Sequence, residues 1–146
     1  MKKIAIFQEN LTVGGIQKSL INLLNNLDYS KVSVDCYVVN DVNFYTEGIS
    51  KKVKLKKLIA LPKICKYLPF FLVKYFYNPK IYEKYDVTID FSSYSQETAI
   101  AAIKTKSDKK YIMCHDQMLE RMKHEIKYKY LVFINKEKYK FFDSVI

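Results

Sequence analysis

A histidine and an aspartate follow one of the apolar runs of this chain, where their side chains could do chemistry. Residues 111–114 (YIMC) are largely apolar, and His115 and Asp116 come directly after them. A neutral imidazole can hydrogen-bond a sugar hydroxyl, and an imidazolium can offset the charge that develops on a phosphate. In the alternative interpretation, Asp116 caps a following helix and neither residue touches a ligand. Their position favours a catalytic role for His115, with Asp116 as a substrate-binding residue.

Two adjacent glycines form a second candidate site. Residues 4–7 (IAIF) are a continuous apolar run typical of a buried strand, and from residue 16 apolar residues recur at helical spacing. Gly14 and Gly15 lie between them, where a ligand can approach the backbone closely and the helix start presents free N–H groups. Such a loop suits a phosphate or a sugar hydroxyl. The alternative is a tight turn in which glycine supplies a positive φ.

Four further polar residues are weaker candidates for binding a substrate. Ser92 and Tyr94 follow the apolar run 87–91, and they suit either an acceptor hydroxyl or a turn and helix cap. Glu9 and Asn10 follow the first apolar run and are expected to point toward a ligand cleft beyond the end of that strand. The sequence offers no Ser-His-Asp set, metal-ligand cluster or pair of carboxylates arranged for hydrolysis, so we expect no metal and no cofactor.

The glycine pattern argues against two common phosphate-binding loops. A dinucleotide fingerprint needs three glycines spaced G-x-G-x-x-G and an acid after the second strand. Asp41 could be that acid, but only Gly14 and Gly15 are present, six residues beyond the strand. A Walker loop is excluded because no G-K-[ST] follows.

The elements that must position these residues alternate along the chain. Apolar runs predict strands, and amphipathic or small-residue stretches between them predict helices. The expected strands are 2–8, 32–39, 53–59, 87–91, 111–114 and 142–146; the expected helices are 16–27, 62–79, 98–103 and one or two within 118–139, where 131–134 could instead be a strand. This alternation predicts an α/β fold in a single domain over residues 1–146: a Rossmann-like, doubly wound, mainly parallel sheet with helices on both faces. Ligands on such sheets bind beyond the carboxyl ends of the strands, where the candidate residues lie.

Charge and cysteine content narrow the functional classes. The net charge is +10, but Arg121 is the only arginine, whereas a nucleic-acid interface would usually use arginine for its bidentate contacts. We therefore expect no nucleic-acid partner; the charge fits an anionic membrane leaflet or simple solubility.

Cys36, Cys65 and Cys114 are scattered, with Cys36 and Cys114 in expected buried strands, so the sequence predicts free thiols in a reducing cytoplasm. No signal peptide is visible.

The segment 62–85 mixes aromatic residues with lysines and has two interpretations. It is either a core helix whose lysines extend to solvent or an interfacial helix that docks peripherally on the inner face of the membrane. Its apolar run 68–73, interrupted by Pro69, is far too short to cross a bilayer.

Four patches, in the same order along the chain, resemble family 4 glycosyltransferases, which have the two-domain GT-B architecture. Residues 14–20 (GGIQKSL) are similar to the GG-(A/I)-(E/Q)-(R/K) loop and helix of that family. Residues 85–92 (YDVTIDFS), 110–116 (KYIMCHD) and 139–146 (YKFFDSVI) are similar to its later segments. Members of the family often build bacterial capsules and other cell-surface polysaccharides.

The resemblance implies the N-terminal, acceptor-side domain of a retaining enzyme that moves a sugar from a nucleotide sugar to a saccharide or lipid-linked acceptor. In the family, the loop matched by Gly14 and Gly15 faces the donor diphosphate and the transferred sugar, a histidine at the place of His115 contacts that sugar, and a bound metal is generally not needed. A second domain binds the nucleotide; we expect it to be absent from residues 1–146 and this chain alone to be almost inactive. Three alternatives stay open: a nucleotide- or NAD-binding Rossmann module, a lysine-rich membrane or nucleic-acid interaction module, and a non-catalytic domain.

Overall fold

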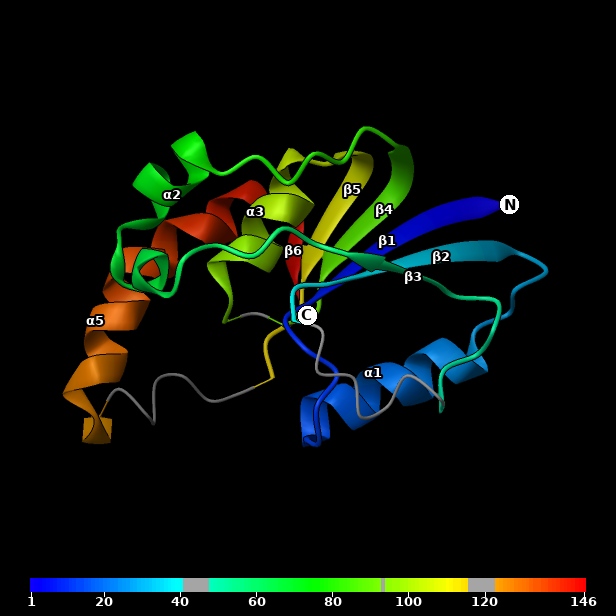
Figure 1. The fold of residues 1–146 in the computed structure, drawn as a ribbon, viewed down its shortest axis with the longest axis horizontal. Coiled ribbons are helices and arrows are strands. Elements are labelled where there is room, and N and C mark those ends of the chain that lie inside the picture. Colours follow the sequence, from blue (N-terminus) through cyan, green and yellow to red (C-terminus); the bar gives the residue numbers. More distant parts are fainter. Residues whose placement is uncertain (41–47, 93, 116–122) are drawn as a thin grey trace.

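Six parallel strands form one sheet, in the order β3-β2-β1-β4-β5-β6 (Figure 1). The computed structural model describes residues 1–40, 48–92, 94–115 and 123–146. The strands are β1 (Lys2–Gln8), β2 (Val32–Val38), β3 (Lys54–Lys57), β4 (Lys84–Asp90), β5 (Lys106–Ile112) and β6 (Ser144–Val145). All of their pairings are parallel, and helices lie on both faces, so the predicted Rossmann-like, doubly wound α/β fold is confirmed.

The helices divide between the two faces of the sheet. The described helices are α1 (Gly15–Asn26), α2 (Phe70–Phe76), α3 (Gln96–Lys104) and α5 (Ile126–Asn135), with the 3₁₀ helices η2 (Lys63–Tyr67) and η3 (Lys136–Phe141). Among the described helices, α1 covers one face, and α3 covers the other (Figure 1). α2 packs on α3 through Phe70 and Val73, so this side of the molecule has an additional outer layer.

Side-chain alternation along β1 explains why both faces are apolar. Successive side chains of a strand point to opposite faces. Ile6 packs with Leu20 of α1, whereas Ala5 and Phe7 pack on the other face with small residues of α3 such as Ala101. A strand buried on both faces needs a continuous apolar run, which is what residues 4–7 supply.

The order of the strands places a switch point between β1 and β4. From β1 the chain continues outward to β2 and β3, and the later strands β4, β5 and β6 extend in the opposite direction. Backbone pairing continues past the strand ends: the N–H of Asn40 donates to the carbonyl of Glu9 at 3.0 Å, and the N–H of Phe91 donates to the carbonyl of Phe7 at 2.9 Å. The loops at the carboxyl edge are therefore held side by side, which is where ligands bind on such sheets.

The single helix expected over residues 62–79 is wrong. The structure has η2, a break at Leu68 and Pro69, and then the short helix α2. The ring of Pro69 disfavours a helical conformation for the residue before it, and Leu68 is extended, with φ −85° and ψ 151°. Pro69 then becomes the N-cap of α2 rather than a residue within a longer helix.

Three smaller expectations also change. β5 starts at Lys106 rather than at Tyr111. The apolar pattern did not reveal this start, because the first half of the strand is polar. Residues 131–134 lie in the helix α5, so the alternative strand there is wrong. Cys114 follows β5 and is exposed, although Cys36 and Cys65 are buried.

Candidate functional site

A cavity of about 420 Å³ opens at the carboxyl edge of the sheet, on the face that α3 covers. Glu9 and Asn40 contribute from the ends of β1 and β2, and residues 94–97 contribute from the start of α3. The opposite wall consists of η2, α5 and the first turn of η3. The cavity therefore lies at the place where the strand order predicts a ligand.

Two amide side chains of the cavity wall keep an oxygen without a partner. Gln96 and Asn135 are 2% and 9% exposed, and the structure gives no hydrogen-bond partner among the described residues for Oε1 of Gln96 or Oδ1 of Asn135. Both amide nitrogens are satisfied: Gln96 donates to the carbonyl of Leu68 and Asn135 to that of Leu131, each at 2.9 Å. A buried acceptor without a donor costs about 1–3 kcal/mol. Both oxygens are also closed to solvent, so a ligand in the cavity would reach them only if the two side chains turned.

Two carboxylates, Glu9 and Glu97, also line the cavity. Burial raises the pKa of Glu9, and the charge of Glu97 raises it further, against the opposing effect of Lys66. The hydroxyl of Ser95, the N-cap of α3, donates to Oε2 of Glu97 at 2.7 Å and orients it. The site thus offers two anionic acceptors close enough to repel each other.

A buried lysine completes the polar lining. Lys138 is 1% exposed, and burial lowers the pKa of its amine, while Asp90 and Cys114 act in the opposite direction. Lys63 and Lys66 of η2 lie exposed at the rim of the same cavity. The cavity therefore combines acceptors with a few cationic donors, a mixture suited to a polar ligand with many hydroxyls.

Of the residues predicted from sequence, Glu9 and Tyr94 line this cavity. Ser92 lies nearby but is only 4% exposed, and its backbone N–H donates to Oδ1 of Asp90 at 3.2 Å. The cap of α3 is Ser95, which accepts a hydrogen bond from the N–H of Thr98, so neither Ser92 nor Tyr94 caps this helix. Their roles in ligand binding stay predictions.

The loop between β1 and α1 is organised by Asn10. Its Oδ1 accepts hydrogen bonds from the backbone N–H of Thr12 at 3.2 Å, from the hydroxyl of Thr12 at 2.6 Å and from Nε2 of Gln17 at 2.9 Å. A Cβ at Gly14 would lie 2.3 Å from Oε1 of Gln17, so the absence of a side chain there lets Gln17 reach Asn10. Gly15 meets nothing within 4 Å.

The glycine pair does not supply positive φ. All three glycines of the chain are described, and none has a positive φ. Gly14 is extended, with φ 176° and ψ 162°, and it is the N-cap of α1 with no side-chain cap. The tight-turn alternative is therefore wrong, and Gly15 instead leaves open space above the first turn of α1.

His115 packs against Phe91, which follows β4. Its Nε2 lies 2.8 Å from the carbonyl oxygen of Phe91, and the centroids of the two rings are 4.8 Å apart. A carbonyl can only accept, so Nε2 carries the proton and Nδ1 of the neutral ring is the acceptor. Phe91 belongs to the core beneath α1, whereas the cavity lies on the face of α3. Asp116 and Asp41 lie outside the described residues.

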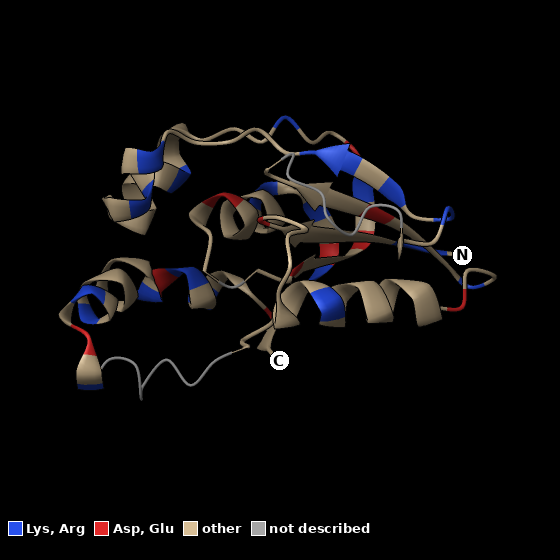
Figure 2. Ribbon diagram, turned by 60° about the horizontal axis from the view of Figure 1, so that its bottom comes forward, with Lys and Arg blue, Asp and Glu red and all other residues tan. Residues whose placement is uncertain are grey.

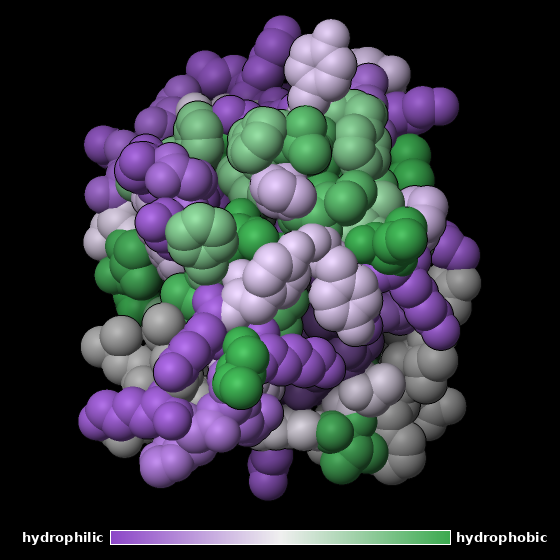
Figure 3. Space-filling view, turned by 90° about the vertical axis from the view of Figure 1, so that its left-hand side faces the viewer, coloured by the Kyte–Doolittle hydropathy of each residue, from purple (hydrophilic) through white to green (hydrophobic). Residues whose placement is uncertain are grey.

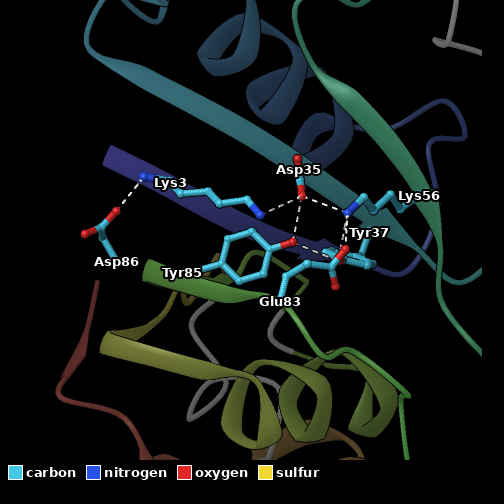
Figure 4. Close-up of polar contacts among 7 residues, drawn as sticks. All are labelled: Lys3, Asp35, Tyr37, Lys56, Glu83, Tyr85 and Asp86. Atoms are coloured by element: carbon cyan, nitrogen blue, oxygen red, sulfur yellow. Dashed lines mark hydrogen bonds and ion pairs between the residues drawn. The ribbon is translucent and has the colours of Figure 1, made fainter. Parts of the chain in front are cut away.

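A second polar cluster lies across β2, β3 and the start of β4 (Figure 4). The carboxylate of Asp35, only 2% exposed as a residue, accepts hydrogen bonds from Nζ of Lys56 at 2.9 Å and from the hydroxyl of Tyr85 at 2.6 Å. Lys56 also contacts Glu83 at 2.8 Å, and Tyr37 shares a hydrogen bond with Tyr85. These groups satisfy one another and join β2, β3 and β4, so we interpret the cluster as structural.

Most residues of the cavity were not predicted from the sequence, among them Gln96, Glu97, Asn135 and Lys138. The helix start at Ser95 was a usable signal for the first two, because side chains next to an N-cap lie at the carboxyl edge of the sheet. Asn135 and Lys138 carried no such signal, since they reach the cavity through the packing of α5 and η3. Among the described residues no group of three or more His, Cys, Asp or Glu side chains is placed to hold a metal ion.

The described helices are all too short or too polar to cross a bilayer. In the comparisons with known proteins, the sequence matches no protein-family model and no curated protein. The functional interpretation of this chain therefore depends on the geometry of the site and on the four sequence patches.

Proposed function

We propose that this chain is the acceptor-binding domain of a glycosyltransferase and that its cavity binds a saccharide. The observation that carries the proposal is the polar lining of a cavity at the carboxyl edge of the sheet, where the carboxylates of Glu9 and Glu97 lie together with lysines of the rim. Sugar hydroxyls are donors as well as acceptors, so a saccharide can bond to the carboxylates of Glu9 and Glu97 and to Lys63 and Lys66 together.

The mixed lining of the cavity favours a sugar over a phosphate as its occupant. The cavity offers two carboxylate acceptors, Glu9 and Glu97, as well as lysine donors, and a sugar hydroxyl can bond to both kinds, whereas a diphosphate at neutral pH has only acceptor oxygens. The open N-terminus of α1 at Gly15 is better suited to a diphosphate, because its N–H groups are donors. This division matches the expected roles of the acceptor and of the donor, whose nucleotide a second domain of the enzyme would hold.

The proposed reaction moves a sugar from a nucleotide sugar to a hydroxyl of the acceptor. Residues around the cavity would orient that hydroxyl, and His115, as an Nε2–H tautomer, would use Nδ1 to accept a hydrogen bond from the transferred sugar. Gly14 and Gly15 would let the donor approach the backbone. No step in this proposal requires a metal or another cofactor.

Saccharide binding by the purified chain tests the proposal. A panel of monosaccharides and short oligosaccharides is titrated while backbone amide shifts are followed by NMR. We expect saturable shifts at Gln96 and Asn135, and binding that is weaker by about tenfold or more in the Glu9→Gln variant, for the loss of one hydrogen bond to a charged group. Asp108→Asn is the matched control, because Asp108 is an exposed acid paired with Lys84 on strand β4.

The competing function is nucleotide or NAD binding. The strand order is that of dinucleotide-binding domains, which keeps this alternative open. It predicts that NAD or a nucleotide shifts the amides around Gly15 while saccharides leave Gln96 and Asn135 unchanged. That result would replace the glycosyltransferase proposal.

A further inference from the structure

Helix α2 is apolar on its outer side as well as its inner side. Phe70 and Val73 are buried against α3. Phe71, Leu72 and Tyr75 point outward and are 65%, 44% and 91% exposed. Exposed apolar side chains gathered on one side of a helix mark an interaction surface, so the outer side of α2 is a candidate docking surface.

The exposed apolar surface extends beyond α2. We call it the aromatic face and define it by Ile64, Tyr67, Phe71, Leu72, Tyr75, Phe76 and Phe141, which are all exposed. A groove of about 630 Å³ lies between α2 and η3, lined by Phe70, Phe71, Tyr75 and Phe141 among others. Figure 3 shows apolar side chains gathered on this side of the molecule, with hydrophilic side chains around them.

Lysines surround the aromatic face. Lys74 Nζ lies 3.4 Å from the ring centroid of Phe141, and Lys74 and Lys104 both line the groove. Lys63 and Lys66 are exposed on η2 beside Ile64 and Tyr67. The single acid of the groove, Glu137, is paired with Lys140 at 2.7 Å. In Figure 2, blue bands mark lysines at the end of the molecule that carries α2 and α5.

We propose that the aromatic face docks on an anionic lipid bilayer. Phe71, Tyr75 and Phe76 would enter the boundary between headgroups and acyl chains, and the surrounding lysines would contact lipid phosphates. Aromatic rings flanked by lysines are typical of membrane interfaces. A protein partner fits less well, because the cores of protein interfaces are depleted in lysine and enriched in arginine, and the only arginine of this chain is Arg121.

The proposed docking surface differs from the membrane segment that the sequence suggested. Docking uses residues of η2 and α2 together with Phe141 of η3, which is distant in the sequence, rather than the whole of 62–85. Lys63 and Lys66 belong both to the surround of the aromatic face and to the rim of the cavity. A docked domain would therefore hold the cavity close to the headgroups, which, if the proposed function is correct, favours a lipid-linked acceptor.

A single tryptophan gives a direct test, because the chain has none of its own. Tyr75→Trp places the probe on the aromatic face. Tyr82→Trp is the matched control: Tyr82 is 81% exposed and lies just before β4, in the stretch that runs away from α2 (Figure 1). Vesicles of phosphatidylcholine with about 30 mol% phosphatidylglycerol are compared with phosphatidylcholine alone, at low and high salt.

We expect the emission of Tyr75→Trp to shift to the blue with the anionic vesicles and that of Tyr82→Trp to stay unchanged. In flotation assays, Lys66→Gln should reduce binding about fivefold, and Phe71→Ser combined with Tyr75→Ser should abolish it while the circular dichroism and Tm are retained. Equal binding to both vesicle types, or unchanged flotation of the double variant, would overturn the proposal. Light scattering that shows a dimer lost in the double variant would also overturn it, in favour of a second copy as the occupant. None of these measurements depends on saccharide binding.

Discussion

At the scale of single residues, replacing Glu9 should have opposite effects on stability and on saccharide binding. Burial and the charge of Glu97 raise its pKa, so the ionised form weakens the folded state, and protonation relieves this as the pH falls through the raised pKa. Glu9→Gln should therefore stabilise the protein at pH 7 by up to about 1 kcal/mol, and the gain should vanish below the ordinary carboxyl pKa near 4. Urea unfolding at several pH values measures both. A variant that is less stable at pH 7 would contradict this account of the cavity.

Replacing Gly15 should likewise raise stability but lower activity. It is the first residue of α1, and a Cβ there would meet nothing within 4 Å. Gly15→Ala should raise the free energy of unfolding by about 0.4–1 kcal/mol, because alanine loses less conformational entropy on folding. If a donor phosphate approaches this backbone, the same variant should lower transferase activity of the two-domain enzyme. Gly48→Ala is the matched control, since that glycine also meets nothing within 4 Å.

At the scale of elements, the start of α3 positions the cavity. Ser95 caps this helix by accepting from the N–H of Thr98, and its hydroxyl holds Glu97. Ser95→Ala should cost about 1 kcal/mol of stability, whereas Ser95→Gly, which keeps a favourable N-cap type, should cost a few tenths. Chemical denaturation of the three proteins measures the difference. A loss near zero in both variants, which both lack the hydroxyl, would show that the side-chain cap contributes nothing.

The polar cluster of Asp35 makes the sheet sensitive to acid. Burial raises the pKa of Asp35, but hydrogen bonds from Lys56 and Tyr85 outweigh it and hold the pKa below its ordinary value. A lowered pKa means that this stabilisation is complete above pH 4 and is lost as the pH falls through the lowered value. Asp35→Asn should cost about 3 kcal/mol at pH 7 and flatten the acid side of the stability profile. Asp108→Asn, at an exposed ion pair, should change neither.

The elements were predictable to the extent that their signal was local. Residues 4–7 predicted β1, because a strand that is buried on both faces is continuously apolar. The polar first half of β5 gave no such signal, because it pairs with β4 through backbone groups whatever its side chains are. The break at Pro69 was readable in principle, since proline restricts the residue before it. The aromatic side chains around it obscured that signal by suggesting one long amphipathic helix.

At the scale of the whole molecule, the cavity illustrates what a sequence pattern cannot reveal. Glu9 and Tyr94 were predicted because each follows a strand, and parallel strands end at one edge. The approach of Glu97 to Glu9, and of Asn135 to Gln96, depends on how α3, α5 and η2 pack around that edge. These residues are distant in the sequence, and no motif links them. The position of the site was therefore predictable, but most of its lining was not.

If the proposed function is correct, the whole molecule is the acceptor-binding part of a larger enzyme. The cavity offers two carboxylates beside a few lysines, a mixture that suits an acceptor sugar, whereas a leaving nucleotide diphosphate needs concentrated positive charge, which a second domain would supply. Residues 1–146 alone should therefore bind a saccharide yet release no nucleotide from UDP-, GDP- or ADP-sugars in the presence of a membrane extract. A coupled nucleotide assay measures release, with saccharide titration of the same preparation as the control for folding. Release by this chain alone, abolished in His115→Ala, would support glycosyl transfer but contradict its division between two domains, because the groups that stabilise the leaving diphosphate would then have to lie within this one.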